Sequence, residues 1–319
     1  MKYRNLGQWG VKVSAVSLGS WLTYGGTVGE QTAIDCIRRA YELDVNFFDT
    51  ANVYMRGASE EVMGRGLAPF SRESYVLATK VFFPMGDGPN DSGLSRKHIF
   101  EQCHLSLKRL NADYIDLYQC HRFDAHVPVE ETARAMDDLV RQGKVLYWGV
   151  SEWNAEQIAN VVELSREEGW AVPVSNQPQY SALWRKIEAE VLPECEEVGM
   201  GNVVWSPLAM GILTGKYSGV DDVPADSRAA TDGKMFMGDY FTQPVLDAVQ
   251  ELRPVAADAG VTIGQLALAW CLRQPMVSSV IVGATKVEHV AENVKAADVE
   301  LDEDVLDAVD NIIGPFAAS

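Results

Sequence analysis

Short runs of β-branched and aromatic residues alternate with longer amphipathic stretches along the chain, and this alternation restricts the fold more than any other feature. Such alternation indicates parallel strands joined by crossover helices, because consecutive parallel strands need a long connection. The predicted strands are residues 16–18, 46–48, 75–79, 115–119, 145–150, 174–177, 202–205 and 279–282. The predicted helices include residues 30–43, 97–110, 129–142, 155–168 and 187–198.

Eight strands with intervening helices predict an α/β fold, the closed (β/α)8 TIM barrel. The alternative is an open, doubly wound sheet, which usually has a G-x-G-x-x-G turn after its first strand. Here the first strand continues into Leu18-Gly19-Ser20-Trp21, which does not match that turn. Residues 2–5 and 11–14 flank the segment 6–10 and predict an N-terminal β-hairpin that plugs the barrel floor.

No linker rich in Pro, Gly and Ser divides the 319 residues, so we expect a single domain over residues 1–319. Barrels of this kind commonly exceed ~250 residues as one unit. The longest irregular stretch runs from residue 217 to about residue 240 and is rich in Gly, Asp and Pro. A loop of that length in a compact domain is expected to be a functional lid or a mobile segment.

The chain carries 45 acidic and 27 basic residues, a formal net charge of −18. An acidic surface repels phosphate backbones, so we expect no nucleic-acid partner. The first ten residues do not resemble a secretory signal, and no apolar run approaches the ~18 residues of a membrane helix, so no membrane association is expected. The five cysteines form no C-x-x-C pair. They predict neither disulfides nor a metal site and favour the reducing cytoplasm.

Ionisable side chains stand at the ends of three successive predicted strands. Asp49 ends the second strand, Lys80 ends the third and His121 follows the fourth, while Tyr54 lies five residues after Asp49. Each residue taken singly is explained by capping, solvation or packing. Because active sites of such barrels lie at the carboxyl ends of the strands, the four together predict one catalytic site.

This group of residues suggests carbonyl chemistry. A tyrosine has an ordinary pKa near ~10, and a neighbouring ammonium group is expected to lower it. Lys80 would play that part for Tyr54, Asp49 would hold Lys80 in place, and His121 would orient a carbonyl oxygen. The arrangement would protonate an oxygen while a hydride, most naturally from a nicotinamide, attacks the carbon.

At these residues the sequence resembles the aldo-keto reductase superfamily over nearly its whole length. The motifs that carry the resemblance are Tyr3-Arg4-Asn5-Leu6-Gly7, Ser17-Leu18-Gly19-Ser20-Trp21, Asp49-Thr50-Ala51-Asn52-Val53-Tyr54 and Ser59-Glu60-Glu61-Val62-Met63-Gly64. The catalytic residues of the superfamily correspond to Asp49, Tyr54, Lys80 and His121. Further stretches such as Gly211-Ile212-Leu213-Thr214-Gly215-Lys216-Tyr217 resemble the branch that holds potassium-channel β subunits and bacterial reductases. The channel subunits carry Asn in place of His121, so this residue favours a working reductase.

The resemblance also implies a nicotinamide cofactor. Ser151 and Gln177 would hold the carboxamide, and Trp205 would stack on the ring. The other implied contacts are Ser20, Trp21, Asp49, Ser206, Pro207, Leu208, Gly211, Lys216, Arg228, Gly283, Thr285, His289, Glu292 and Asn293. Two departures from relatives, Glu152 and His289, lie near the cofactor, and Lys216, Arg228 and Lys286 would compensate in binding the 2′-phosphate. NADP(H) is therefore favoured, with NAD(H) as the alternative.

The implied activity is the NADPH-dependent reduction of small aldehydes and ketones to alcohols, with Tyr54 as the general acid. The substrate pocket is expected to contain Trp21, Tyr54, Phe82, Phe83 and His121, although plain packing explains the two phenylalanines equally well. The alternative is a regulatory subunit that binds NADP(H) and turns over slowly. A metal- or phosphate-dependent barrel lyase is disfavoured, because it would need more carboxylates or histidines at the strand ends. The resemblance further implies a homo-oligomer.

Overall fold

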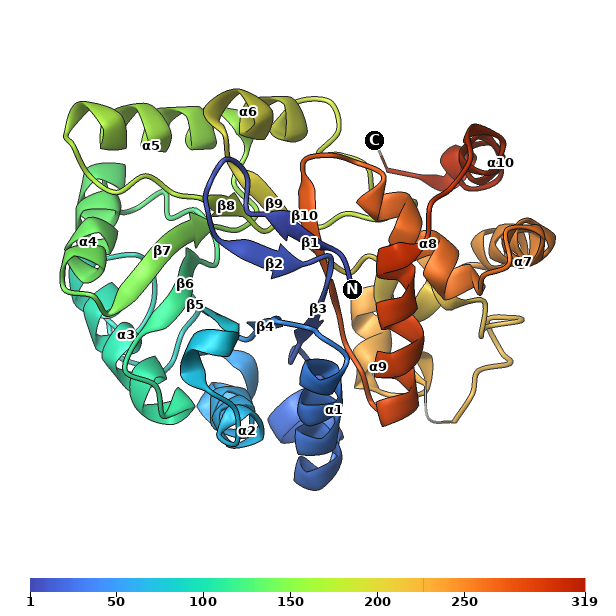
Figure 1. Cartoon of the computed structure of the whole chain (residues 1–319), viewed down its shortest axis with the longest axis horizontal. Helices are drawn as coiled ribbons and strands as arrows, with labels where there is room; N and C mark the ends of the chain where they lie inside the picture. Colours follow the sequence, from blue (N-terminus) through green and yellow to red (C-terminus); the bar gives the residue numbers. More distant parts are fainter. Residues whose placement is uncertain (226, 319) are drawn as a thin grey trace.

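The computed structural model describes residues 1–225 and 227–318 and shows a closed barrel of parallel strands (Figure 1). The strands follow the order β10-β3-β4-β5-β6-β7-β8-β9, so the last strand pairs with the first strand of the ring. Their bounds are β3 (Val16–Gly19), β4 (Phe47–Asp49), β5 (Val76–Val81), β6 (Ile115–Cys120), β7 (Val145–Val150), β8 (Ser175–Asn176), β9 (Gly201–Trp205) and β10 (Val277–Val282). All eight predicted strands, and the predicted (β/α)8 TIM barrel, are thereby confirmed.

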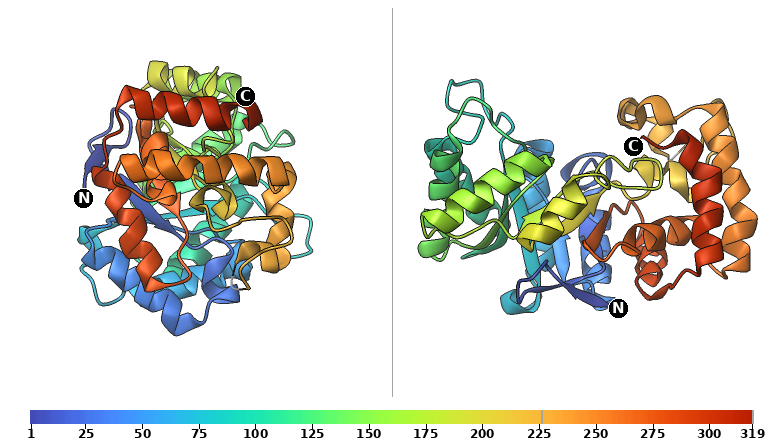
Figure 2. Two further views of the ribbon diagram at one scale, coloured as in Figure 1. Left: turned by 90° about the vertical axis from the view of Figure 1, so that its right-hand side faces the viewer. Right: turned by 90° about the horizontal axis from the view of Figure 1, so that it is seen from above.

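Helices surround the barrel, and α7 and α10 lie against each other on the outer side of its C-terminal half (Figures 1 and 2). The helices are α1 (Glu30–Glu42), α2 (Ala58–Leu67), α3 (Arg96–Leu110), α4 (Val129–Arg141), α5 (Ala155–Glu167), α6 (Val191–Val198), α7 (Gln243–Asp258), α8 (Ile263–Leu272), α9 (Val287–Val294) and α10 (Glu303–Ile313). In the described residues no single helix is long and apolar enough to cross a membrane. The pair α7 and α8 meets the length and composition test only together, across a bend of 84°.

Two sequence predictions differ from the structure. The helix predicted over residues 187–198 begins only at Val191. Pro193 lacks an N–H group and its ring would clash with the carbonyl four residues earlier, so a helix cannot run through from residue 187. The stretch from residue 217 to about 240 is not irregular throughout, because it contains the 3-10 helices η5 (Arg228–Ala230) and η6 (Asp232–Tyr240). Tyr217 and Met237 of this stretch are buried and anchor it to the core.

The predicted N-terminal hairpin is confirmed: β1 (Tyr3–Asn5) and β2 (Lys12–Ser14) pair antiparallel across one end of the barrel (Figure 1). Leu6 and Val13 are buried and pack with side chains inside the barrel, among them those of Phe47 and Leu117. Gly7 has a φ of +60°, and a β-carbon there would stand 2.5 Å from the backbone N of Gly201. The hairpin therefore closes the floor and leaves the opposite end of the strands for a site.

Candidate active site

The four predicted catalytic residues converge at the carboxyl ends of β4, β5 and β6. Asp49 ends β4, Lys80 lies near the end of β5, His121 directly follows β6 and Tyr54 opens the 3-10 helix η2 (Tyr54–Gly57). The Lys80 ammonium is fully buried. It donates to Asp49 Oδ2 at 2.5 Å and to the carbonyl oxygen of Thr50 at 2.8 Å, and lies 3.5 Å from the Tyr54 hydroxyl. Parallel strands bring these residues together because all their carboxyl ends open on one mouth.

Two buried glutamines hold the carboxylate of Asp49 from the other side. Gln177 Nε2 donates to Asp49 Oδ1 at 2.9 Å, and Gln119 Nε2 lies 3.5 Å from the same oxygen. The Ser151 hydroxyl donates to the carbonyl oxygen of Gln177 at 2.8 Å, which fixes the backbone beside this network. Gln119 was not among the predicted site residues. The period of two along β6, from the barrel-interior Leu117, would have pointed to it.

The pKa of Tyr54 shifts in the opposite direction to the one expected from the sequence. Burial raises the pKa of Tyr54 well above its ordinary value of 10.0, and the negative charge of Asp49 raises it further. The expected lowering of this pKa is therefore not found, because burial of the phenol and the negative charge of Asp49 outweigh the effect of nearby positive charges. Burial also lowers the pKa of Lys80, against the raising effect of Asp49. Tyr54 accordingly remains a protonated hydrogen-bond donor at neutral pH.

His121 lies beside Tyr54 and carries no charge at neutral pH. Its ring centroid lies 5.7 Å from that of Tyr54 and 4.9 Å from that of Phe83, both in edge-to-face geometry. Burial lowers the pKa of His121 well below its ordinary value of 6.5, and the charges of Lys80 and Arg122 lower it further. A neutral imidazole can donate one hydrogen bond to a carbonyl oxygen without competing with the phenol for its proton.

One large cavity of about 1690 Å³ joins this group to the loops after β9 and β10. Most of the predicted site residues line it. They are Trp21, Asp49, Tyr54, Phe83, His121, Ser151, Gln177, Trp205, Ser206, Pro207, Leu208, Gly211, Lys216, Arg228, Gly283, Thr285, His289, Glu292 and Asn293.

Four predicted residues do not line the cavity, namely Lys80, Ser20, Phe82 and Lys286. Lys80 reaches the site only through Asp49 and Tyr54. Ser20 is buried and donates to the Thr50 hydroxyl at 2.8 Å. Phe82 packs against the core and meets the ring of Phe83 edge to face, so packing explains Phe82 better than a place in the pocket.

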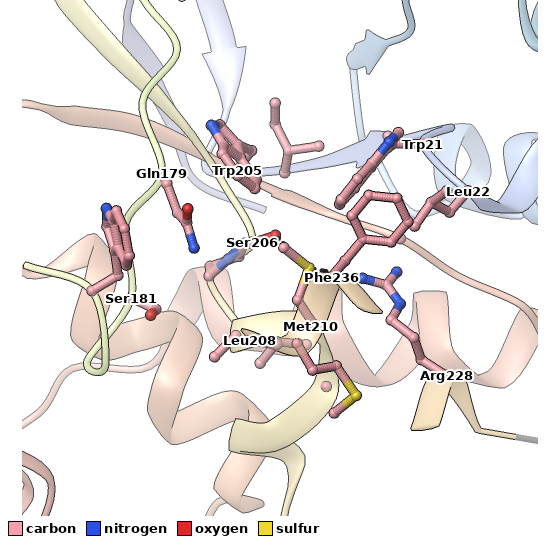
Figure 3. Close-up of a pocket in the computed structure, with 18 of the residues that line it drawn as sticks. Trp21, Leu22, Gln179, Ser181, Trp205, Ser206, Leu208, Met210, Arg228 and Phe236 are labelled. Atoms are coloured by element: carbon pink, nitrogen blue, oxygen red, sulfur yellow. Dashed lines mark hydrogen bonds between the residues drawn. The ribbon is translucent and has the colours of Figure 1, made fainter. Parts of the chain in front are cut away.

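Aromatic side chains contact one another across the cavity. The ring centroid of Trp21 lies 5.9 Å from that of Trp205 and 5.2 Å from that of Phe236, and Figure 3 shows Trp21 and Phe236 close together. The Trp205 indole N–H donates to Glu152 Oε1 at 2.8 Å, and the backbone N–H of Gln179 donates to the same oxygen at 2.5 Å. Glu152, noted in the sequence only as a departure from relatives, therefore orients the indole of Trp205.

The far part of the cavity has the features of a phosphate-binding site. Arg228 is half-buried, which lowers its pKa, and it takes part in none of the ion pairs between described residues. A β-carbon at Gly211, where φ is +95°, would stand 3.1 Å from Lys216 Nζ, so the glycine leaves space beside that cation. Cations that line a cavity without carboxylate partners favour bound anions, and the half-buried Arg228 and the exposed Lys216 fit the phosphates of a dinucleotide.

The comparison with protein families decides the assignment. The profile described as "Aldo/keto reductase family" matches residues 15–313. The chain belongs to this family. The predicted family is thereby confirmed, and its members are NAD(P)H-dependent oxidoreductases.

Curated relatives extend over almost the whole of this aldo/keto reductase. Proteins named "Probable voltage-gated potassium channel subunit beta" from Oryza sativa subsp. japonica and Arabidopsis thaliana are 43% and 44% identical. Both alignments cover 98% of this chain and 97% of the relative. A "Putative voltage-gated potassium channel subunit beta" from Schizosaccharomyces pombe is 44% identical over 98% of this chain and 93% of its own length. The predicted likeness to the channel-subunit branch is confirmed.

Proposed function

We propose that this aldo/keto reductase uses NADPH to reduce small aldehydes and ketones to alcohols, with Tyr54 as the general acid. The observation that carries the proposal is the position of the Tyr54 hydroxyl. It lies 3.5 Å from a buried ammonium, beside a neutral histidine, on the wall of one cavity. When bound, the reduced nicotinamide supplies a hydride to the carbonyl carbon. Tyr54 donates its proton to the carbonyl oxygen, which becomes the alcohol hydroxyl.

The remaining residues support that proton transfer. A buried phenolate is costly, and the Lys80 ammonium stabilises it as the proton leaves. Asp49 keeps Lys80 charged and in place, and Gln177 and Gln119 fix Asp49. His121 hydrogen-bonds the carbonyl oxygen and holds it toward the phenol. Trp21 and Phe83 form apolar walls for the substrate, which suits small carbonyl compounds.

We assign the rest of the cavity to the cofactor. Ser151 and Gln177 hold the carboxamide, and Trp205 presents one face of its indole to the nicotinamide. The segment with Ser206, Pro207, Leu208 and Gly211 accommodates the pyrophosphate. Lys216, Arg228 and Lys286 approach the 2′-phosphate, so NADP(H) is favoured over NAD(H). Gly283, Thr285, His289, Glu292 and Asn293 enclose the adenosine.

The names of the relatives favour one alternative, a regulatory subunit that binds NADP(H) and turns over slowly. Under either function we propose that residues 1–319 act as one domain in the cytoplasm and that copies of the chain assemble as a homo-oligomer. His121 favours the reductase, because a neutral imidazole beside the phenol can hydrogen-bond the carbonyl oxygen of a substrate.

The test is the oxidation of NADPH in the presence of para-nitrobenzaldehyde. The wild-type chain should turn over, and Tyr54→Phe should lose at least about a hundredfold in kcat, the usual scale for a positioned acid, while still binding NADPH. Retained wild-type turnover in Tyr54→Phe would rule out Tyr54 as the acid. NADPH binding by the wild-type chain without any turnover would instead support the regulatory subunit.

A further inference from the structure

Arg122 stands next to the catalytic group and has no part in the proposed chemistry. It follows His121 in the chain and lines the same cavity wall. Arg122 Nη1 donates to the carbonyl oxygen of His121 at 2.5 Å, and its guanidinium lies 5.5 Å from the centroid of the Phe83 ring. These two contacts hold the guanidinium over the substrate side of the cavity rather than over the proposed phosphate site.

The charge of Arg122 has no carboxylate counterpart. None of the ion pairs between described residues includes it, whereas the half-buried Arg72 and Arg273 each pair with an acid. The carboxylates lining the cavity in the described part of the chain are Asp49, Asp239 and Glu292. Asp49 is bound to Lys80, and the other two lie on η6 and α9. In a chain with 45 acidic residues, an unpaired cation beside a catalytic site needs an explanation.

The positive charge of Arg122 also acts on the groups that surround the proposed position of the substrate carbonyl. Arg122 lowers the pKa values of Tyr54, Lys80 and His121, so its positive potential reaches the three groups around the reacting carbonyl. A guanidinium presents five N–H donors in a planar fork that matches an oxyanion. The backbone oxygen of His121 uses one nitrogen of Arg122, and the remaining donors are available for a ligand.

From this placement we propose that the physiological substrates are aldehydes or ketones with an oxyanion, a carboxylate or phosphate, which Arg122 binds while Tyr54 and His121 hold the carbonyl oxygen. The proposal rests on the proposed reductase function and specifies its substrate class. A neutral aldehyde would enter the same pocket and leave the guanidinium unpaired against the Phe83 ring. An anionic one would satisfy that charge, so Arg122 determines specificity rather than proton transfer.

The experiment compares para-carboxybenzaldehyde with para-nitrobenzaldehyde, which have nearly the same shape and differ in charge. The ratio of their kcat/KM values should fall about tenfold or more in Arg122→Gln, the scale of one hydrogen bond to a charged group. Arg122→Lys keeps the positive charge but loses the planar fork of donors, so its ratio should lie between those of the wild-type chain and Arg122→Gln. A second pair, glyceraldehyde 3-phosphate and glyceraldehyde, shows whether the oxyanion is a phosphate. The pair of aldehydes whose ratio falls more in Arg122→Gln shows whether Arg122 binds a carboxylate or a phosphate.

Lys186→Gln is the matched control, since it removes one positive charge from another wall of the same cavity. It should leave both ratios unchanged. An unchanged ratio of kcat/KM values in Arg122→Gln, or an equal loss in Lys186→Gln, would overturn the proposed role of Arg122. The proposed reductase function would not be affected.

A binding measurement does not depend on hydride transfer. In a calorimetric titration benzoate should bind the wild-type chain more tightly than benzamide, and this difference should disappear in Arg122→Gln. If the wild-type chain reduces none of the four aldehydes, the reductase function fails, and the substrate assignment fails with it.

Discussion

Backbone strain in the described chain is concentrated where the active site is. Nine residues other than glycine have a positive φ. Asp44 and Asn111 follow helices, where short polar side chains tolerate the left-handed conformation. The other seven lie in loops at the carboxyl ends of barrel strands and are Leu22, Met55, Arg56, Glu152, Ser206, Ala209 and Met210. Each such residue costs on the order of 1–3 kcal/mol, so the surrounding packing must hold these loops in place.

Asp49 and Lys80 should act as one unit, because their charges touch at 2.5 Å in a buried site. Asp49→Asn and Lys80→Met are each expected to lower kcat/KM strongly, and the double variant should lose little more than the worse single variant. The coupling should amount to about 1–3 kcal/mol. Kinetics of the four proteins measure it. If the two effects simply add, the residues do not work together.

His121 makes folding sensitive to acid. Its pKa in the folded chain is lowered by burial, so below about pH 6.5 the unfolded chain binds a proton that the folded chain does not. Stability therefore falls as the pH falls, by up to about 1.4 kcal/mol per pH unit for this residue. Urea unfolding at neutral and at acidic pH should show a smaller loss in His121→Asn than in the wild-type chain. Identical losses in the two proteins would mean that His121 is protonated in the folded state.

At the scale of residues, the sequence was sufficient to predict which residues form the site and insufficient to predict the contacts between their side chains. Asp49, Lys80 and His121 could be found because strand ends converge by rule. The glutamine partners of Asp49 and the Glu152–Trp205 hydrogen bond arise from side chains that meet only after the barrel closes. The direction of the Tyr54 pKa shift depends first on the burial of the phenol and then on the charge of Asp49, and spacing along the chain does not show how deeply a side chain is buried.

Among the elements, an ion pair between the buried Glu60 and the half-buried Arg109 connects α2 to α3. Arg109 Nε donates to Glu60 Oε2 at 2.5 Å, and the Thr79 hydroxyl donates to Glu60 Oε1 at 2.6 Å. A β-carbon at Gly57, where φ is +95°, would stand 2.6 Å from Arg109 Cδ, so the end of η2 rests on this side chain. The pair thus fixes the short helix that carries Tyr54 and the strand that carries Lys80.

Removal of one partner should therefore destabilise the chain more than removal of both. Arg109→Met leaves the fully buried Glu60 without its cation, and the expected cost in unfolding free energy is about 3–5 kcal/mol. The double variant Glu60→Gln, Arg109→Met should recover a part of that loss. Denaturant unfolding checks both, with Arg65→Met, an exposed helical arginine paired with Glu30, as the control. Equal stability of Arg109→Met and the wild-type chain would show that the pair contributes nothing.

Regular elements were predictable because their periodicity is local. The strands agree within two residues at either end, since runs of β-branched and aromatic residues coincide with the buried ladder. The failures had two causes. The start of α6 depends on Pro193, a local signal that hydrophobic periodicity alone does not include. Tertiary contacts decide η5 and η6, which are held by buried Tyr217 and Met237 rather than by any helical pattern of their own.

For the whole molecule, the distribution of charge predicts the preferred cofactor. Despite the net charge of −18, Lys216 and Arg228 line one end of the cavity. NADPH should bind about tenfold or more tightly than NADH, because even one hydrogen bond from a cation to the 2′-phosphate is worth roughly 1.5–3 kcal/mol. Fluorescence titration with both cofactors measures the difference. Equal affinities would remove the NADP(H) preference and leave the reductase proposal intact.

The effect of pH separates His289 from the two fixed cations. Burial lowers the pKa of His289, and Lys286 and Lys216 lower it further, so His289 is neutral at neutral pH. If it contacts the 2′-phosphate, NADPH binding should strengthen only below about pH 6.5, while NADH binding stays constant. The same titrations repeated at acidic pH test this, and a parallel change for both cofactors would exclude the contact.

Ring closure also has a consequence for the chain while it is being made. β3 and β10 pair through Val16 and Val280, so the ring lacks its final contact until nearly the entire chain has left the ribosome. Until then β3 presents an unpaired edge, and such edges readily pair with other chains. Contacts between residues so far apart also slow folding. Synthesis is therefore the period when this protein is most exposed to aggregation, and the closed ring ends that exposure in one step.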